Sequence, residues 1–523
     1  MPSIRRTPEH KPLSFTTTMR NPERVAGFLA CLKQFDGQTL TNELIDKIAK
    51  QIIKQKLYKP MSIGRTPALR SIYESDETFT EEQLDQILED NPQNHKEAGF
   101  DKGWPSRFDT WFGEMGKELG LVYYEMNKPI RISQAGHMLC DAYDSLSADD
   151  DVSKKVQNVF LNGFIKFQSN NPLRRNANEN VPVVLLMNVI KLLKNDDDEN
   201  DAGISRKEIP FVLCWPDNDA NKLYRFIKRF RNEYRFKASD DTVYNLCLGL
   251  LGSTNQTRFK KSQITKESVD DFLRKIKITG VFTLRGMGRF VDFNKLEHEK
   301  IDYVLANYGE YREFDNELDY YNFVGSMDPK IISIETDTVT YNITDIRKAK
   351  LIEIAQKYSN EQIRDELELL SSNRKSSDEY LSDIDEPTRL EFLTSVALQQ
   401  TLEDVSVEAN YAIDDEGNPT FTARGGIGDI EVYDNDNNSL FEVTLMRGKQ
   451  QAVAEIPAIS RHLNELNKEN KFAVFIAPVL HADADYMIKF TKAQYKLDIL
   501  GYTIPEFCGK LKTTTRLREF ASA

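Results

Sequence analysis

Two runs near the end of the chain, GDIEVY (428–433) and SLFEVTL (439–445), decide how its last third folds. Both runs are rich in β-branched and aromatic residues, and the residues between them, 434–438, are all Asp or Asn. This pattern predicts a β-hairpin. Because every second side chain of a strand shares a face, Asp429 at the mouth of the first strand can reach the same point as Glu442.

The hairpin offers the hard oxygen ligands that Mg²⁺ prefers. These are the carboxylates of Asp429 and Glu442 and the main-chain carbonyl of Val443. A metal ion held there can lower the pKa of a water molecule and offset charge that builds on a scissile phosphate. The ordinary alternative is a pair of solvated acids on an exposed strand. Phe441, Val443 and Leu445 alternate with Glu442, so we expect a largely buried strand in which a charge needs a partner such as a metal.

The residues around this hairpin alternate between helical and strand patterns, as in an α/β domain. The expected helices cover 387–402, 449–467 and 484–495, and the expected strands lie near 405–411, 420–424 and 472–478. Glu391 and Glu455 each lie in an apolar helical setting. We therefore expect several carboxylates to converge within one small domain.

Composition bounds the rest of the chain. A length of 523 residues suggests about three domains, and the five dispersed cysteines, with no CxxC pair, are typical of reduced thiols. His298-Glu299 is followed by Asp302 where a zinc protease motif needs histidine. The N-terminus lacks a secretory pattern and the longest apolar stretch, 181–193, is too short to span a bilayer, so we expect a cytoplasmic protein without membrane contact.

The first 305 residues are expected to be mainly helical. Helical patterns are followed by a hairpin pattern at 121–133, and the same order returns between 205 and 293, where a second hairpin has Gly286 and Gly288 at its tip. Helices followed by a hairpin are the order of a winged helix, a common DNA reader. An acidic run, 195–201, lies between the two units and is typical of a solvated loop.

The net charge of −13 is spread unevenly, and basic residues gather in the N-terminal region. Residues 222–237 contain seven Lys or Arg and one acid, interleaved with aromatic residues. One helical face could bury the aromatics while Arg225, Lys228, Arg229 and Arg231 face phosphate, although an ordinary amphipathic helix fits the pattern equally well. Further candidates for DNA contact lie at the second hairpin and near the N-terminus: Arg285, Arg289, Arg20 and Arg24.

The chain also resembles a known family. Its C-terminal third resembles the PD-(D/E)XK nuclease core, and more specifically the AlwI-type type IIS restriction endonucleases and their nicking relatives. The resembling segments are 387–391, 423–430, 442–444, 450–455 and 461–463, with 16–24, 28–33 and 104–108 in the N-terminal region. Arg107 lies in the last of these and joins the candidates for DNA contact.

The resemblance implies roles for particular residues. Glu391, Asp429 and Glu442 would be the metal-binding acids, and Glu455 and His462 further members of the active site. Thr444 departs from the nuclease motif, which has a catalytic lysine there. His462, Arg447 or Lys449 could supply a proton acceptor or a positive charge instead. We favour His462, because seven residues place it two helical turns from Glu455, although it could equally be an exposed helix residue.

The expected fold is thus a multidomain α/β protein with a mainly α, winged-helix-like recognition region, a helical linker and a C-terminal PD-(D/E)XK-like nuclease domain. The expected boundaries are 1–193 and 202–305 for two recognition subdomains, 306–380 for the linker and 381–523 for the nuclease domain. The resemblance implies a Mg²⁺-dependent endonuclease, with Mn²⁺ as a substitute, that cuts double-stranded DNA outside an asymmetric site.

Other readings of the sequence remain open. The enzyme could cut both strands or nick one, and cutting both would need a transient homodimer, a second cleavage subunit or sequential nicks. A restriction enzyme also implies a cognate methyltransferase in the host. A DNA-binding regulator with a nuclease-like dimerisation domain is the main alternative, and a structure-specific repair nuclease is another.

Overall fold

The computed structural model describes residues 8–15, 19, 21–75, 77–91, 106–144, 152–196, 203–253, 255–286, 288–466 and 470–520. The chain divides into two compact units. The first comprises Met1–Pro60, Glu81–Asp144 and Lys154–Asp337, and the second Met61–Thr80, Ser145–Ser153 and Thr338–Ala523. Residues 306–380, expected to form a linker, are thus shared between the two units.

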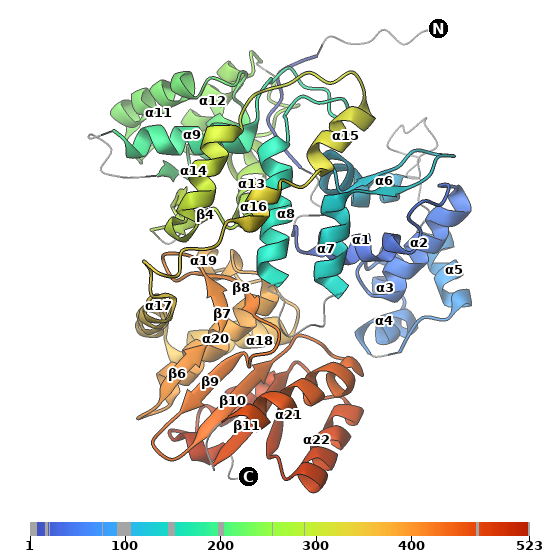
Figure 1. Cartoon of the computed structure of the whole chain (residues 1–523), viewed down its shortest axis with the longest axis vertical. Helices are drawn as coiled ribbons and strands as arrows, with labels where there is room; N and C mark the ends of the chain where they lie inside the picture. Colours follow the sequence, from blue (N-terminus) through green and yellow to red (C-terminus); the bar gives the residue numbers. More distant parts are fainter. Residues whose placement is uncertain are drawn as a thin grey trace. The chain divides into compact units, whose positions relative to one another are not determined.

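The first unit is mainly helical (Figure 1). Its α-helices are α1 (Arg24–Lys33), α2 (Asn42–Lys54), α5 (Glu81–Asp90), α6 (Ser106–Phe112), α7 (Gln134–Asp144), α8 (Val152–Lys166), α9 (Pro182–Lys194), α10 (Ile209–Leu213), α11 (Ala220–Tyr234), α12 (Asp240–Leu250), α13 (Ser268–Lys277), α14 (His298–Asn307), α15 (Glu317–Gly325) and α16 (Pro329–Ser333). Short π-helical or 3-10 turns are η3 (Gly113–Glu118), η5 (Gln263–Glu267) and η6 (Lys295–Glu297). A mainly α N-terminal region is therefore confirmed.

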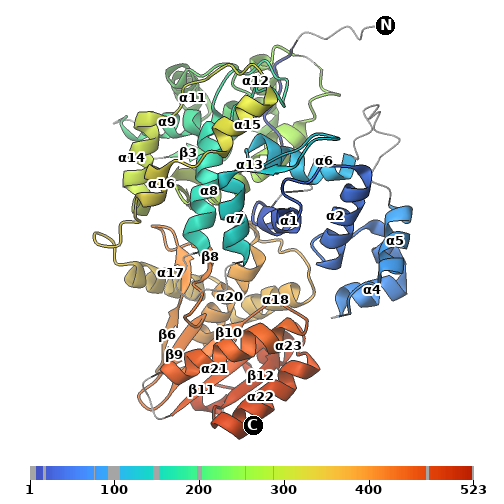
Figure 2. The ribbon, with the colours of Figure 1, turned by 45° about the vertical axis from the view of Figure 1, so that its right-hand side comes forward.

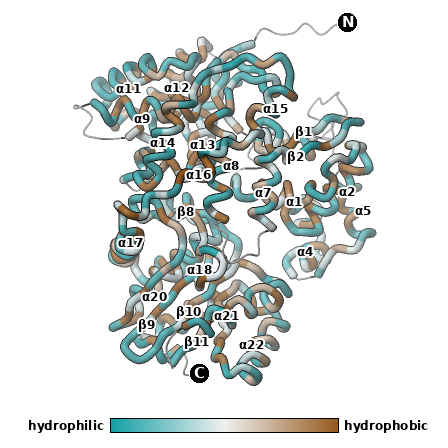
Figure 3. Tube along the Cα trace, in the orientation of Figure 1, coloured by the Kyte–Doolittle hydropathy of each residue, from teal (hydrophilic) through white to brown (hydrophobic). Residues whose placement is uncertain are grey.

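Local chemistry explains where α11 begins and which side it buries. The Asp219 carboxylate accepts a hydrogen bond from the main-chain N–H of Lys222 and caps the helix. Leu223, Ile227 and Phe230 recur every three or four residues and are buried, so one side of the helix packs into the unit. Figure 3 shows hydrophilic and hydrophobic residues alternating along α11.

Both expected hairpins of this unit are present. β1 (Val122–Tyr123) pairs antiparallel with β2 (Arg131–Ile132), and β4 (Phe282–Arg285) with β5 (Phe290–Phe293). Gly286 at the second tip has a φ of +61°, a conformation that favours glycine. A further short strand, β3 (Ile204–Ser205), pairs with β5 and was not predicted; the helix α10 begins only at Ile209.

The second unit contains a five-stranded mixed sheet in the order β12-β11-β10-β9-β6 (Figures 1 and 2). Its strands are β6 (Ser406–Ala409), β9 (Ile430–Tyr433), β10 (Asn438–Val443), β11 (Lys471–Ala477) and β12 (Ile499–Thr503), and a separate hairpin pairs β7 (Tyr411–Ile413) with β8 (Pro419–Ala423). Its helices are α3 (Met61–Arg65), α4 (Pro67–Glu74), α17 (Ile343–Lys357), α18 (Asn360–Ser371), α19 (Glu379–Ser382), α20 (Glu386–Thr401), α21 (Ile456–Glu465), α22 (Ala482–Tyr495) and α23 (Ile504–Lys510), with the short turns η7 (Gln451–Glu455) and η8 (Leu517–Glu519).

Strand β10 lies between β9, to which it is antiparallel, and β11, to which it is parallel. Leu440 belongs to the core that α21 and α22 cover, whereas Phe441 contacts Phe507 and Phe520 on the other face. Glu442 follows with the parity of Leu440 and so faces the α21 side. The predicted hairpin and the burial of its second strand are confirmed.

The predicted helix 449–467 differs from the structure. Residues Gln451–Glu455 form the π-helical turn η7, and the α-helix α21 begins only at Ile456. Pro457 at the start of α21 explains the break, because proline lacks the N–H that would continue the hydrogen bonding of an unbroken α-helix. Strand β12 and helix α23 at the end of the unit were not predicted.

None of the helices within the described ranges has the length and apolar character needed to cross a membrane.

Candidate active site

Asp429 and Glu442 meet where β9 and β10 come together. The Asp429 carboxylate accepts a hydrogen bond of 2.8 Å from the main-chain N–H of Val443, and the N–H of Asp429 donates to Glu442 Oε2 over 3.4 Å. The two carboxyl groups lie close enough for each to affect the pKa of the other. Gly428 leaves room for this pair, since a Cβ atom there would lie 3.1 Å from Glu442 Oε1.

Glu391 approaches the same point from helix α20. Its side chain is only 4% exposed, and its Oε2 accepts a hydrogen bond of 2.9 Å from the main-chain N–H of Ala423 at the end of β8. Burial and the nearby carboxylates of Asp429 and Glu442 hold the pKa of Glu391 well above its ordinary value. Helix α20 thus brings a third acid to the pair.

His462 and Glu455 complete the cluster from α21 and η7. His462 Nδ1 lies 2.9 Å from Glu442 Oε1, and His462 Nε2 is buried without a hydrogen-bond partner among the described residues. The side chain is 8% exposed, so the reading of His462 as an exposed helix residue is wrong. Glu455 is half-buried and its carboxylate hydrogen-bonds the Thr444 side chain. Thr444 stands where the nuclease motif has a lysine.

The electrostatics of the cluster follow from burial of like charges. Burial first, and the neighbouring Glu442 second, raise the pKa of Asp429 well above its ordinary value. Burial raises the pKa of Glu442 to about 8, and it also raises the pKa of Glu455. Burial and the nearby Arg461 lower the pKa of His462. Burial and like charge therefore disfavour the ionised carboxylates, and a bound cation would offset that cost.

A metal ion at this site would have carboxylate and carbonyl oxygens as its ligands. In the described part of the chain, no group of three or more His, Cys, Asp or Glu side chains is placed to hold a metal ion. Mg²⁺ differs from zinc in this respect, because it binds through one or two carboxylates and keeps several water molecules. Asp429 and Glu442, with the Val443 carbonyl beside them, fit that requirement.

Other cationic groups near the hairpin point elsewhere. The Arg447 guanidinium donates to the main-chain carbonyl of Ser371, and Lys449 is exposed. His462 is therefore the one of the three proposed substitutes for a lysine that contacts Glu442 directly.

The predicted basic face of α11 is formed in part. Arg225 and Arg229 are exposed, and with Trp215, Lys222 and Lys228 they line a hollow of about 560 Å³. Lys228 forms an ion pair with Asp196. Arg231, expected on the same face, is instead buried and bound through two nitrogens to the Glu208 carboxylate, because it lies on the side of α11 that packs inward.

The remaining candidates for DNA contact have different surroundings. Arg285 is held within its hairpin by Asp292 and the carbonyl of Phe293, whereas Arg289 is exposed at the tip. Arg24 donates to the carbonyl of Leu57 and Arg107 to the Tyr58 hydroxyl. Arg20 lies outside the described residues, as do residues 197–201 of the acidic run.

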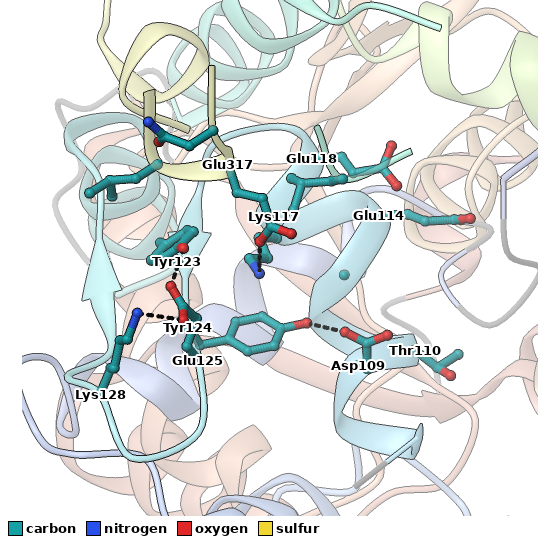
Figure 4. A pocket seen from close by; sticks show the side chains of 14 residues that line it. Asp109, Thr110, Glu114, Lys117, Glu118, Tyr123, Tyr124, Glu125, Lys128 and Glu317 are labelled. Atoms are coloured by element: carbon teal, nitrogen blue, oxygen red, sulfur yellow. Dashed lines mark hydrogen bonds and ion pairs between the residues drawn. The ribbon is translucent and has the colours of Figure 1, made fainter. Parts of the chain in front are cut away.

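A cavity of about 970 Å³ in the first unit was not anticipated (Figure 4). The turn η3, strand β1 and the start of α15 line it with more carboxylates than lysines: Asp109, Glu114, Glu118, Glu125 and Glu317 against Lys117 and Lys128. Lys117 pairs with Glu317 and Lys128 with Glu125. Because acids outnumber lysines, the cavity is unsuited to binding phosphate. Its walls come from segments that lie apart in the sequence, so no sequence pattern could reveal it.

Comparison with known proteins shows the family of this chain. A sequence model of the AlwI restriction endonuclease family matches residues 117–344 and 324–509. The chain belongs to this family and is a DNA-cleaving restriction endonuclease. No curated protein sequence matches it.

Solved structures of restriction endonucleases are among its structural matches. The small subunit (R.BspD6I2) of the heterodimeric restriction endonuclease R.BspD6I is 24% identical, with a TM-score of 0.25, over 29% of this chain and 76% of that one. Restriction endonuclease FokI is 10% identical over 98% of both chains, and FokI bound to DNA is 11% identical over 98% of this chain and 97% of that one, each with a TM-score of 0.25.

Proposed function

We propose that the chain is a type IIS endonuclease that hydrolyses DNA phosphodiesters with Mg²⁺, at a short distance outside an asymmetric site. The observation that carries this proposal is the cluster of the buried Glu442 and Glu391 with the half-buried Asp429, in which carboxylates face one another. Burying like charges costs free energy, and residues with such raised pKa values are concentrated at functional sites. The division of the chain into two compact units supports separate reading and cutting.

Asp429 and Glu442, with the Val443 carbonyl, would hold the metal ion. When bound, Mg²⁺ would acidify a water molecule and offset the charge on the phosphate. Glu391 would add negative charge that strengthens cation binding. Mn²⁺ prefers the same oxygen ligands and is expected to substitute.

His462 is placed to orient Glu442 and to accept a proton. Its Nδ1 contacts Glu442 Oε1, while its buried Nε2 has no hydrogen-bond partner among the described residues and could accept a proton. A lowered pKa keeps the imidazole neutral at pH 7, the form that can accept a proton. Glu455 and Thr444 would position the same water, so that together these groups take over the role of the missing lysine.

The first unit would read the DNA. The exposed Arg225 and Arg229 on α11 offer charge to phosphates, and Lys228 could exchange Asp196 for a phosphate. The hairpins β1–β2 and β4–β5 follow helices, as the wings of winged helices do.

Incubation of the full chain with supercoiled plasmid and Mg²⁺ tests this function. We expect cleavage that requires a divalent cation, and end mapping should place all cuts at one offset from a shared sequence. Glu403→Gln, an exposed acid of the same unit, is the matched control for the active-site variant Glu442→Gln and should cut normally. Equal cutting by Glu442→Gln would contradict the proposed site, and scattered ends would contradict the type IIS assignment.

A further inference from the structure

Phe236 lies just beyond the end of helix α11 and is exposed to solvent. The other aromatic side chains of residues 222–237 are buried or half-buried, whereas Phe236 is 48% exposed. An aromatic ring that stays in water contributes less to folding than a buried one, since the hydrophobic gain is proportional to the apolar area removed from water. The stability of the first unit therefore does not by itself explain this residue.

Two neighbours hold the Phe236 ring in place. The Phe290 ring of strand β5 packs against it edge-on, with the ring centroids 5.2 Å apart and the ring planes at 84°. The Arg231 guanidinium lies 5.4 Å from the centroid of the Phe236 ring, and its hydrogen bonds to the Glu208 carboxylate fix its position. A ring that is already held loses little side-chain entropy when a further partner packs against it. Phe236 is thus a pre-organised aromatic surface.

The main chain that carries this ring is strained. Arg235 has a φ of +49°, a conformation that costs free energy for a residue with a side chain. On the C-terminal side of the turn, Lys207 Nζ donates a hydrogen bond of 2.7 Å to the main-chain carbonyl of Ala238. Strained main-chain conformations are concentrated at sites that bind ligands, where the surrounding structure holds them. The strain therefore supports a binding role for the turn at 235–238.

Exposed cations lie next to the ring. Arg235 and Lys237 are its neighbours in sequence, and Arg289 precedes the phenylalanine of β5 that the ring contacts. All three side chains are exposed, and none of them forms an ion pair with another described residue. The nearest acid in the sequence, Glu233, already has a tyrosine hydroxyl as its hydrogen-bond partner. Positive charge therefore predominates beside the ring.

Duplex DNA fits these features better than another protein does. Phosphates bind exposed arginine and lysine side chains, and an aromatic ring can stack on any base because every base has a π-face. A single ring offers too little apolar area for a stable protein interface. Helix α11, which ends just before the ring, also carries Arg225 and Arg229, to which phosphate contact is assigned in the proposed function. The ring thus extends a surface that faces DNA in that proposal.

We propose that Phe236 is a wedge that inserts between two base pairs of the recognised DNA, while Arg235, Lys237 and Arg289 hold the phosphates beside it. Apolar wedges of this kind enter from the minor groove, unstack one base step and kink the duplex. TA and CA steps unstack most easily, so the ring would select such a step without forming hydrogen bonds to its bases. The inference rests on the proposed function, because it assigns Phe236 a part in reading the site.

The fluorescence of 2-aminopurine tests for unstacking. This analogue replaces, one at a time, each adenine of either strand within and beside the mapped recognition site, and the full chain carries Asp429→Asn so that the duplex stays uncut. Every TA or CA step contains an adenine. We expect fluorescence to rise at least about threefold at one step, because the wedge removes the stacking that quenches the analogue. Phe236→Ala should abolish this rise, and Phe236→Trp, which keeps an aromatic ring, should retain it.

Binding affinity separates the ring from the cations beside it. Phe236→Ala should weaken binding of this duplex about tenfold and leave the slope of log K against log salt unchanged, because no phosphate contact is lost. Lys237→Ala should instead reduce that slope by about one. Tyr495→Ala, which removes an exposed aromatic side chain of the second unit, is the matched control and should change neither affinity nor fluorescence. Fluorescence anisotropy at several salt concentrations measures these effects.

The outcomes distinguish the wedge from the proposed function. A fluorescence rise that persists in Phe236→Ala, or a bound duplex in which no adenine is unstacked, overturns the wedge, while cleavage at the site still supports the nuclease. If replacing one thymine with deoxyuridine costs as much affinity as Phe236→Ala and no base unstacks, the ring contacts a thymine methyl group instead. A wild-type chain that neither cuts DNA nor prefers any sequence refutes the proposed function and the wedge together.

Discussion

The two units of the chain treat buried charge in opposite ways. In the first unit, three buried pairs join side chains of opposite sign: Arg231 binds Glu208, Lys275 binds Asp271 and Lys300 binds Glu297. In the second unit, Glu442 and Glu391 are buried and Asp429 is half-buried, and the three acids face one another. The first arrangement compensates charge within the fold, whereas the second leaves charge for something outside the chain to compensate.

This difference separates structural from functional acids. A buried ion pair is roughly neutral for stability, and only its disruption is costly, so a side chain such as Glu208 is explained by the arginine beside it. A cluster of carboxylates is unfavourable as it stands and is retained only where it does something else. A buried acid of the first unit is therefore explained by its ion pair, whereas the clustered acids of the second unit indicate a functional site.

The largest expected effect is the loss of cleavage in Asp429→Asn. The variant keeps the shape of the side chain but removes a charge that would bind the metal ion, so we expect the rate to fall by at least about a thousandfold. A gel shift should show unchanged affinity for DNA, because binding is assigned to the other unit. Cleavage near the wild-type rate would place the active site elsewhere.

Changing His462 should have the next largest effect. His462→Ala removes the group that contacts Glu442 Oε1 and could accept a proton, so we expect a decrease in kcat of about a hundredfold with little change in KM. Single-turnover cleavage rates measured over a range of pH test this effect. If His462 accepts a proton, its loss also removes the part of the pH–rate profile that reports its titration. If His462→Gln, which can still bond to Glu442, retains the wild-type profile, the histidine only positions that acid.

The exposed cations of the first unit should affect binding rather than chemistry. Arg225→Ala combined with Arg229→Ala is expected to weaken DNA binding about tenfold at moderate salt and to reduce the slope of log K against log salt by about two. Fluorescence anisotropy at several salt concentrations measures both. Arg285→Ala is the contrasting variant, because its guanidinium is held by Asp292; it should leave the salt slope unchanged.

Much of the second unit could be predicted from sequence because its signals are local. Alternating apolar residues and an Asn/Asp turn predicted the β9–β10 hairpin, and the same alternation predicted that Glu442 is buried. The placement of Glu391 required a resemblance, since Ala423 and Asp429 lie far from it in sequence.

Other features could not be predicted because they depend on long-range packing. Whether a basic residue of α11 faces water or Glu208 depends on a shift of a few residues along one helix, and periodicity alone placed Arg231 wrongly. Strand β3 is two residues long and exists only through its pairing with β5. The break before Ile456, by contrast, could have been predicted from Pro457 alone.

The smallest predicted effect is on stability, and its sign follows from the carboxyl cluster. Glu442 has a pKa of about 8 in the folded chain, above the value of about 4.3 for an unperturbed glutamate, so the folded state keeps its proton longer as pH rises. Its contribution to stability is therefore full below about pH 4 and is lost progressively up to about pH 8.

Without divalent cations, urea unfolding followed by a probe in the second unit should show the free energy of unfolding falling between pH 5.5 and pH 8. The expected fall is at least about 1 kcal/mol, the equivalent of roughly one pKa unit. Glu442→Gln has no charge to lose and should flatten this dependence, as should Mg²⁺ at pH 8 for the wild-type chain. An equal fall in Glu442→Gln would show that the acids near Asp429 are not the source of the pH dependence, and the contrast between the two units would lose its thermodynamic basis.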